Sequence, residues 1–354
     1  MKKIIALALT LVMVLALCAC GAAPATAAAP AAEGSADLGT YTIRIALENS
    51  DTFPATLGLK QMEKYVESHT GGNVQIDIYS NGQLGGEEET LEQAAQGTIE
   101  MAVASFAPLA TYNSAFELMD IPFLFTTYQQ AWMVLDSYVG TDLLGTLEST
   151  GLKGLAYMEN GFRQCTSSQG AIETMADLSG LKIRTMQNNN HMASFTALGA
   201  NPTPVPFSEL YMALSQKVAD AQENPIANVT DKKLYEVQGY LSLTNHIYDA
   251  MPLVCNLEFW NNLPAEYQTV VQAGAIYGME YSRFCNAERE AEILAYLTDN
   301  GMKVNEVSAD AHDEMKATAQ PAVLELVKKD VGEDVVDQFL SDVDTVIGDI
   351  SNWG

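Results

Sequence analysis

Basic residues are scarce in this chain of 354 residues, which has 18 Lys and Arg against 45 Asp and Glu and a formal net charge of −27. Nucleic-acid binding requires Lys and Arg that displace counterions from phosphates, so this class of function is excluded. An acidic surface usually keeps a protein soluble. Because charges more than about 8 Å apart are largely screened at physiological salt, a local cation in a cleft can still bind an anion.

Sequence motifs for catalysis and for metal binding are also missing. The chain has no Gly-x-Ser-x-Gly, no His-Glu-x-x-His, no phosphate-binding glycine loop and no Gly-x-Gly-x-x-Gly. Its four histidines lack the spacing of zinc ligands. Adjacent carboxylates such as Glu87 and Glu88 would not face a common substrate on a helix, and we interpret them as part of a solvated face. We therefore expect a protein that is not an enzyme and that uses neither a cofactor nor a metal.

The first forty residues predict export. Lys2 and Lys3 precede a largely apolar segment, residues 4–17, that is too short for a lasting transmembrane helix, so residues 1–19 are interpreted as a signal peptide. The segment ends in Leu-Cys-Ala-Cys, which resembles the lipobox of bacterial lipoproteins and implies lipidation of Cys20. Residues 20–38, mostly Ala, Pro, Gly and Ser, are expected to form a flexible tether.

Long apolar runs and a cysteine framework are absent from the rest of the chain. No other stretch reaches the roughly 18 to 20 apolar residues of a spanning helix, so the lipid anchor is the only predicted membrane contact. Cys165, Cys255 and Cys285 are widely and irregularly spaced. We expect buried free thiols at these positions, although one pair could form in an oxidising compartment.

From Tyr41 onward, strand-like and helix-like segments alternate, which predicts an α/β protein with largely parallel sheets. Apolar residues at helical spacing predict one helix over residues 128–144 and a much longer one over residues 265–299. The long helix could span the whole molecule, although Gly274 and Gly278 weaken that prediction.

The length of the chain predicts two lobes, because just over three hundred residues exceed what one hydrophobic core usually holds. The expected first lobe covers residues 39–160 and about 250–288. The second covers residues 161–249 and about 289–354. The fold class is therefore a two-lobe α/β fold with a long helix across both lobes.

Two of the rare arginines, Arg163 and Arg184, lie at strand-like edges of the second lobe. Ligands of open α/β sheets bind beyond the carboxyl ends of strands. Arg184 follows an apolar strand, so its planar side chain would project into such a crevice and could pair with a carboxylate. A surface salt bridge is the alternative. The amide-rich segments 187–190 and 222–224 are typical of turns but could also bind a polyol.

Several motifs together resemble one known family. Residues 180–228 (GLKIRTMQNNNHMASFTALGANPTPVPFSELYMALSQKVADAQENPIAN) and 235–246 (YEVQGYLSLTNH) closely resemble the DctP-type solute-binding proteins of tripartite ATP-independent periplasmic (TRAP) transporters. Further matches are SNGQLGG at residues 80–86, IPFLF at 121–125 and GFRQ at 161–164. The resemblance covers nearly all of the chain after the leader.

This resemblance implies a Venus-flytrap fold that binds a ligand between its lobes and releases it to two integral membrane subunits driven by an ion gradient. Arg184 matches the family arginine that clamps the ligand carboxylate, Arg163 a second basic residue of the cleft, and Asn224 an asparagine that contacts the same carboxylate. The other candidate ligand contacts are Phe207 as an aromatic wall, Met186 and Asn188 near the arginine, and Ser105, Phe106 and Glu48 from the first lobe.

The ligand class follows from a departure from the family pattern. Asn189 stands where many relatives have proline, which adds an amide near the arginine and suggests a hydroxylated acid such as a uronate or another sugar acid. A C4-dicarboxylate is the alternative ligand. A sensory lipoprotein with the same fold is an alternative function, and a secreted hydrolase would need a nucleophile with an oriented base. We expect a monomer that is lipid-anchored outside the cytoplasm.

Overall fold

The computed structural model describes residues 38–351 of the chain. The predicted signal peptide, Cys20 and nearly all of the predicted tether fall on residues 1–37 and lie outside the described residues. The residues from Thr40 onward form one compact unit, so the predicted boundaries between two lobes stay predictions.

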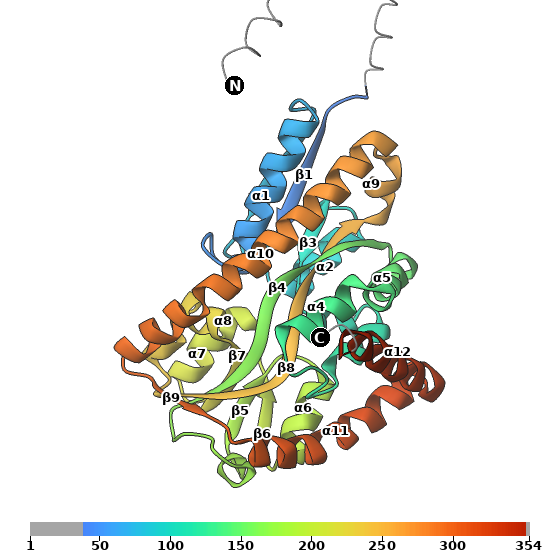
Figure 1. Ribbon diagram of the computed structural model, residues 1–354. Helices are drawn as coiled ribbons and strands as arrows, with labels where there is room; N and C mark the ends of the chain where they lie inside the picture. Colours follow the sequence, from blue (N-terminus) through green and yellow to red (C-terminus); the bar gives the residue numbers. More distant parts are fainter. Residues whose placement is uncertain (1–37, 352–354) are drawn as a thin grey trace, which may run out of the picture. The chain divides into compact units, whose positions relative to one another are not determined.

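Within residues 38–351, a mixed sheet of nine strands runs through this unit in the order β2-β1-β3-β8-β4-β7-β5-β6, with β9 beside β8 (Figure 1). Strands β1, β2 and β3 are parallel to one another, as are β5, β6 and β7. The strands are β1 (Tyr41–Ala46), β2 (Val74–Tyr79), β3 (Met101–Val103), β4 (Leu152–Ser167), β5 (Lys182–Thr185), β6 (Asn201–Pro204), β7 (Ala221–Pro225), β8 (Tyr240–Asn256) and β9 (Lys303–Glu306).

Two long antiparallel strands, β4 and β8, join the two halves of this sheet. Strand β3 pairs with one end of β8, where Met101 lies opposite Cys255. Strand β7 pairs with the carboxyl-terminal end of β4, at the opposite end of this two-stranded ribbon, where Ser167 lies opposite Ala221. Between residues 154 and 165 the β4–β8 ladder shifts register three times, and such bulges bend and twist strands. The two halves of the sheet therefore connect through a bent two-stranded ribbon, as in the predicted two-lobe fold.

Helices surround the sheet and connect its strands (Figure 1). They are α1 (Pro54–His69), α2 (Glu87–Ala95), α3 (Phe106–Ala110), α4 (Tyr128–Asp136), α5 (Tyr138–Gly145), α6 (Asn189–Ala197), α7 (Leu210–Ser215), α8 (Ile226–Asp231), α9 (Leu257–Asn262), α10 (Ala265–Asp299), α11 (Ala309–Val331) and α12 (Glu333–Ser351). Short 3-10 helices are η1 (Ser114–Asp120), η2 (Thr146–Thr150), η3 (Met175–Leu178), η4 (Phe207–Glu209) and η5 (Leu234–Glu236). None of the helices in the described part of the chain has the length and apolar character needed to cross a membrane.

The long helix predicted over residues 265–299 is confirmed as α10, an unbroken helix of 35 residues. Its glycines are disfavoured by helix propensity but allow α1 to approach closely. A Cβ atom on Gly278 would lie 2.8 Å from the carbonyl oxygen of Gly58 in α1. Because α10 also packs on β4, α8 and β9, it contacts both halves of the sheet (Figure 1).

The single helix predicted over residues 128–144 is broken at Ser137, so this prediction is wrong. Helix α4 ends at Asp136 and α5 begins at Tyr138. The hydroxyl of Ser137 accepts a hydrogen bond from the backbone N–H of Val139 at 3.1 Å and caps the second helix. Apolar spacing alone did not reveal this cap.

The apolar loop at residues 121–125 connects the two parts of the core. Phe123 packs with Cys165, Ile183 and Phe195 in a core formed mainly by residues of the predicted second lobe. Its backbone N–H donates to the carbonyl oxygen of His246 at 2.7 Å. A loop predicted to belong to the first lobe therefore completes the core of the second.

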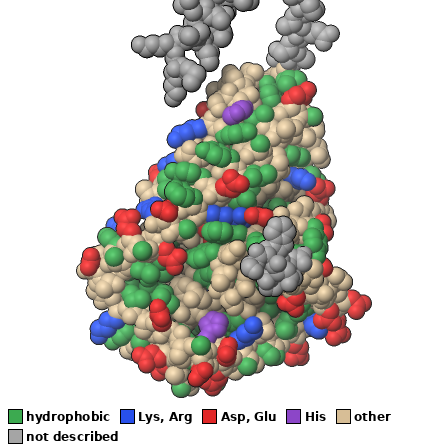
Figure 2. Space-filling model, in the orientation of Figure 1, with side chains coloured by type: hydrophobic (Ala, Val, Ile, Leu, Met, Phe, Trp, Pro, Cys, Tyr) green, Lys and Arg blue, Asp and Glu red, His purple; other side chains and the backbone are tan. Residues whose placement is uncertain are grey.

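The surface and the cysteines agree with the sequence. Figure 2 shows one face of the molecule, on which acidic side chains are scattered among basic and apolar ones. Cys165, Cys255 and Cys285 are buried free thiols, as predicted.

Candidate ligand-binding site

Arg184 lies near the carboxyl end of the short parallel strand β5. It pairs with Gln222 of β7 and Thr203 of β6. Its side chain is only 1 % exposed, and its one hydrogen bond within the described residues runs from Nε to the carbonyl oxygen of Val205 at 2.8 Å. Nη1 is buried and has no partner there. Burial lowers the pKa of Arg184 to about 10, so the guanidinium is still protonated at neutral pH.

A pocket of about 230 Å³ opens beside Arg184, with walls from both halves of the sheet. The first half contributes Glu48, Gly86, Glu87, Glu88, Glu89 and Pro108, and the second contributes Arg184, Met186, Gln187, Val205, Pro206, Phe207 and Ser208. A much smaller cavity shares some of these residues and is lined by Asn49, Glu87, Ser105, Asn160, Met186, Phe207, Asn224, Asn228 and Met251. Because Arg184 lines the pocket, the pocket offers a cationic side chain to a small anion. Within residues 38–351, no three His, Cys, Asp or Glu side chains are placed to hold a metal.

Phe207 and Met186 are apolar residues that line both cavities. Lys232 follows α8, and its Nζ lies 4.7 Å from the centroid of the Phe207 ring. The same Nζ donates to the backbone carbonyl of Glu48 at 3.0 Å. Lys232 therefore links the aromatic wall in one half of the molecule to the end of β1 in the other.

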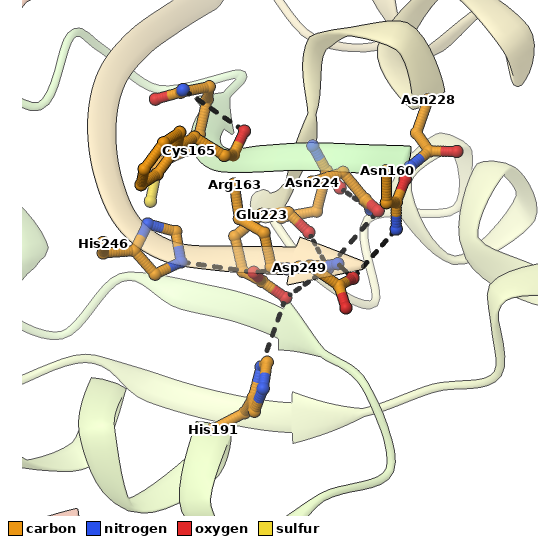
Figure 3. A network of polar contacts seen from close by, with 12 residues as sticks. Asn160, Arg163, Cys165, His191, Glu223, Asn224, Asn228, His246 and Asp249 are labelled. Carbon is orange, nitrogen blue, oxygen red and sulfur yellow. Dashed lines mark hydrogen bonds and ion pairs between the residues drawn. The ribbon is translucent and has the colours of Figure 1, made fainter. Parts of the chain in front are cut away.

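Arg163 lies in a buried polar cluster, drawn in Figure 3. Its Nε and Nη2 donate to the carboxylate of Glu223, and its Nη1 donates to Asp249 Oδ2 at 2.8 Å. Nη2 also contacts Asn224 Oδ1 at 3.3 Å. Burial by itself would raise the pKa of the Glu223 carboxyl, but Arg163 and two neighbouring histidines hold that pKa well below its usual range. Since its donors are taken by protein carboxylates, the geometry of Arg163 favours positioning of Asn224 over direct contact with a ligand.

Asn224 and Ser105 line the smaller cavity from opposite halves of the molecule. The Nδ2 of Asn224 donates to Gln222 Oε1 at 2.6 Å. The backbone N–H and the hydroxyl of Ser105 both donate to Glu87 Oε1, at 2.8 and 2.9 Å. Both side chains are thus held in place at the smaller cavity.

Two other candidate contacts, Asn188 and Phe106, line neither the Arg184 pocket nor the smaller cavity. The Oδ1 of Asn188 accepts two backbone N–H groups in the first turn of α6, and its Nδ2 donates to Asp120 Oδ2 at 2.8 Å. Phe106 is 2 % exposed and packs against the rings of Phe116 and Tyr157. Neither residue lines the pocket or the smaller cavity, because one caps a helix and the other fills the core.

Two buried carboxyl groups form the wall contributed by the first half of the sheet. Glu48 is 4 % exposed, its Oε2 accepts the backbone N–H of Glu87 at 3.3 Å, and its Oε1 is buried without a partner in the described residues. Burial raises the pKa of Glu48, and burial together with the charge of Glu48 raises the pKa of Glu87 to about 7. The assignment of Glu87 to a solvated face is therefore wrong, because it faces inward while Glu88 is exposed.

A family model described as "bacterial extracellular solute-binding protein, family 7" (DctP) matches residues 45–330. The chain belongs to this family. The predicted kinship with DctP-type TRAP solute-binding proteins is confirmed, and family members bind substrates rather than transform them.

Three relatives of this solute-binding protein show the range of its family. It is 35 % identical over 274 residues to the 2,3-diketo-L-gulonate-binding periplasmic protein YiaO of Escherichia coli K12, a match that covers 77 % of this chain and 84 % of that one. It is similar to the sugar acid binding protein DctPAm from Advenella mimigardefordensis in complex with galactonate, with a TM-score of 0.83, 31 % identity and 87 % and 99 % of the two chains covered. A TRAP periplasmic solute-binding protein from Sulfurospirillum deleyianum with bound succinate gives a TM-score of 0.79, 29 % identity and 85 % and 98 % coverage. The fold of these neighbours confirms the predicted two-lobe architecture.

A chain of asparagines near the site of this solute-binding protein was not predicted. Asn49 donates to Asn228, Asn228 to Asn160, and Asn160 to Asp249, each at 2.8 Å (part of this chain is drawn in Figure 3). All three asparagines line the smaller cavity. The available signal was the position of Asn49 just beyond the carboxyl end of β1, where ligands of α/β sheets bind.

Proposed function

We propose that this chain is the extracytoplasmic solute-binding subunit of a TRAP transporter, which captures a small organic acid and delivers it to two integral membrane subunits. The observation that carries the proposal is Arg184, a buried guanidinium whose Nη1 has no partner within the described residues. An uncompensated buried cation is unfavourable. A ligand carboxylate would supply the missing acceptor and fits the planar donors of arginine.

The walls of the pocket support capture by closure. Residues from both halves of the sheet enclose Arg184. An arginine–carboxylate pair gains little in water, whereas a closed cleft has a lower dielectric constant and strengthens the same hydrogen bonds. The ligand would stabilise the closed state by its higher affinity for it. The proposed contacts around the carboxylate are Asn224, Phe207, Met186 and Ser105, with Arg163 holding Asn224 in place.

The ligand is proposed to be a hydroxylated acid such as a uronate or another sugar acid. Support comes from the carboxyl groups of Glu48 and Glu87 and from the asparagines of the smaller cavity, which can bind hydroxyl groups. A C4-dicarboxylate is the alternative, since one structural neighbour has bound succinate. A larger thermal shift with succinate than with glucuronate would contradict the sugar-acid proposal.

Binding of the carboxylate is tested by calorimetry on the wild type, Arg184→Ala and a matched control, Arg44→Ala. Arg44 is 39 % exposed and pairs with Glu100 away from the pocket, so its loss should leave the Kd unchanged. The ligand is first identified by mass spectrometry of the acid that co-purifies with the protein. We expect Arg184→Ala to bind that acid at least about 30-fold more weakly. Equal affinity of the two variants would contradict the proposal.

The membrane attachment is a separate part of the proposal. Cys20 would carry the lipid, and the protein would be a monomer held outside the cytoplasm by this anchor alone. Metabolic labelling with a fatty acid should mark the wild type in cells, and Cys20→Ala should abolish the label. A labelled Cys20→Ala variant would contradict lipidation at this cysteine.

A further inference from the structure

The pocket beside Arg184 contains two buried polar atoms of opposite character that both lack a hydrogen-bond partner within the described residues. Nη1 of Arg184 is a donor, and Oε1 of Glu48 is an acceptor. More than nine in ten buried polar groups in folded proteins are hydrogen-bonded, so each such atom requires an explanation. A single molecule that accepts a hydrogen bond from Arg184 and donates one to Glu48 would satisfy both.

The carboxylate of Glu48 is held firmly in its position. Its Oε2 accepts the backbone N–H of Glu87 at the start of α2, at 3.3 Å. Lys232 fixes the backbone of Glu48 through its carbonyl oxygen. With Oε2 occupied, Oε1 is the atom left for a ligand.

The charges around Glu48 disfavour a second negative charge on the ligand. Glu87 is buried against it, and Glu88 and Glu89 line the same pocket. The only arginine or lysine among the residues that line the pocket is Arg184. Lys232 lies nearby, but its Nζ is already engaged by the backbone carbonyl of Glu48 and the ring of Phe207. A second ligand carboxylate near Glu48 would therefore meet more negative than positive charge and be disfavoured.

We infer that Glu48 is a specificity-determining residue, whose Oε1 accepts a hydrogen bond from a hydroxyl group of the ligand and which disfavours ligands with a second carboxylate in this position. The inference rests on the proposed function, because it takes the carboxylate bound by Arg184 as given. The ligand is then a monoacid with a hydroxyl group at the end opposite its carboxylate. A hydrogen bond to an ionised acceptor is strong enough to change affinity by about 10- to 100-fold.

Four unbranched six-carbon acids test this inference, because they separate hydroxyl groups from the second charge. Gluconate has hydroxyl groups and one carboxylate, glucarate has hydroxyl groups and two, hexanoate has neither hydroxyl groups nor a second carboxylate, and adipate has only the second carboxylate. Calorimetry at about pH 8 should give the lowest Kd for gluconate and the highest for adipate. Glu48→Gln keeps the size of the side chain but removes its charge. We expect this variant to bind gluconate about 10-fold more weakly and adipate no more weakly than the wild type.

Glu87→Gln is the matched control variant. Its Oε1 can still accept the two hydrogen bonds from Ser105, and the change removes a negative charge without removing the proposed acceptor Glu48. We expect it to improve glucarate relative to gluconate while changing the affinity for gluconate less than Glu48→Gln does. Circular dichroism and thermal unfolding of each variant show whether it is folded.

The outcomes separate this inference from the proposed function. If Arg184→Ala abolishes binding of every acid but Glu48→Gln leaves the ratio of the gluconate and adipate affinities unchanged, only the role of Glu48 is overturned. If Arg184→Ala binds the acids as the wild type does, the proposed function fails. Binding of none of the four acids to the wild type at millimolar concentration contradicts the inferred ligand class, while the co-purifying acid still tests the proposed function.

Discussion

Arg163 and Arg184 are equally buried and lie two strands apart in the same sheet, yet their surroundings are opposite. Arg163 donates to the carboxylates of Glu223 and Asp249, whereas Arg184 has one backbone carbonyl and an unpaired Nη1 within the described residues. Burial lowers the pKa of Arg184 to about 10, while the carboxylates around Arg163 outweigh burial and raise its pKa. Burial alone therefore does not separate the two arginines. The proposed ligand role of Arg184 depends on its unpaired Nη1 beside the pocket, and mutation can distinguish the two residues.

The largest expected effect is on stability, at Arg163. Arg163→Met removes the guanidinium that pairs with the buried carboxylates of Glu223 and Asp249, and only the neighbouring histidines remain beside Glu223. Breaking a buried ion pair by removing one partner typically destabilises a protein by about 3 to 5 kcal/mol. Chemical denaturation without ligand should show a loss of this size. A variant as stable as the wild type would contradict a structural role for the cluster.

Arg184→Met should weaken ligand binding without lowering the stability of the unliganded protein, the reverse of what is expected for Arg163→Met. It removes a buried cation without a carboxylate partner, so the unliganded variant should be as stable as the wild type or more stable in the same denaturation assay. Ligand affinity should fall by about 2 to 5 kcal/mol in binding free energy, because the charged hydrogen bonds to the ligand are lost. A loss of stability comparable to that of Arg163→Met would erase the distinction between the two arginines.

The pH dependence of stability should reveal the cluster around Arg163. His191 is buried with Nε2 3.2 Å from Asp120 Oδ1, and although burial alone would lower its pKa, the hydrogen bond to Asp120 and the charge of Glu223, whose Oε1 lies 3.9 Å from Nδ1, raise it to about 9. A raised histidine pKa gives stability that is full below about pH 6.5 and is lost as the pH rises through about 9. The stability advantage of wild type over His191→Gln should thus shrink by about 2 to 3 kcal/mol across this range. An advantage that does not change with pH would mean that His191 is neutral in the folded protein.

The smallest expected effect concerns the shape of the cation in the pocket. Arg184→Lys keeps the charge but replaces the planar pair of donors by a single ammonium group. We expect the Kd for the bound acid to rise about 10-fold, or about 1.4 kcal/mol, with little change in the stability of the unliganded protein. Calorimetry with the co-purifying acid measures this step, and an unchanged Kd would argue against two-point contact with the carboxylate.

Local patterns in the sequence predicted much of this fold. Apolar residues at helical spacing predicted α10, and the strand-like segment before Arg184 placed that residue near the end of a strand. The break at Ser137 was missed because the apolar spacing continues across it, and only the hydroxyl cap reveals it. The capping role of Asn188 had a visible signal, since asparagine directly before a helix is a preferred cap.

The partners of Arg163 could not be predicted in the same way. Glu223 lies 60 positions and Asp249 86 positions away in sequence, on different strands. Which strands become neighbours, and in which register, depends on the whole sheet rather than on any local pattern. For this reason the sequence and the family resemblance could list both arginines as candidate ligand contacts without distinguishing them. Glu87 was assigned to the surface, although its helix turns it into the pocket wall.

The most direct test is a crystal structure of the protein with the acid that co-purifies with it. We predict that the two oxygens of one carboxylate lie about 2.7 to 2.9 Å from nitrogen atoms of Arg184, with Arg163 still paired to Glu223 and Asp249. A bound acid that contacts Arg163 and leaves Nη1 of Arg184 without an acceptor would contradict the distinction between the two arginines.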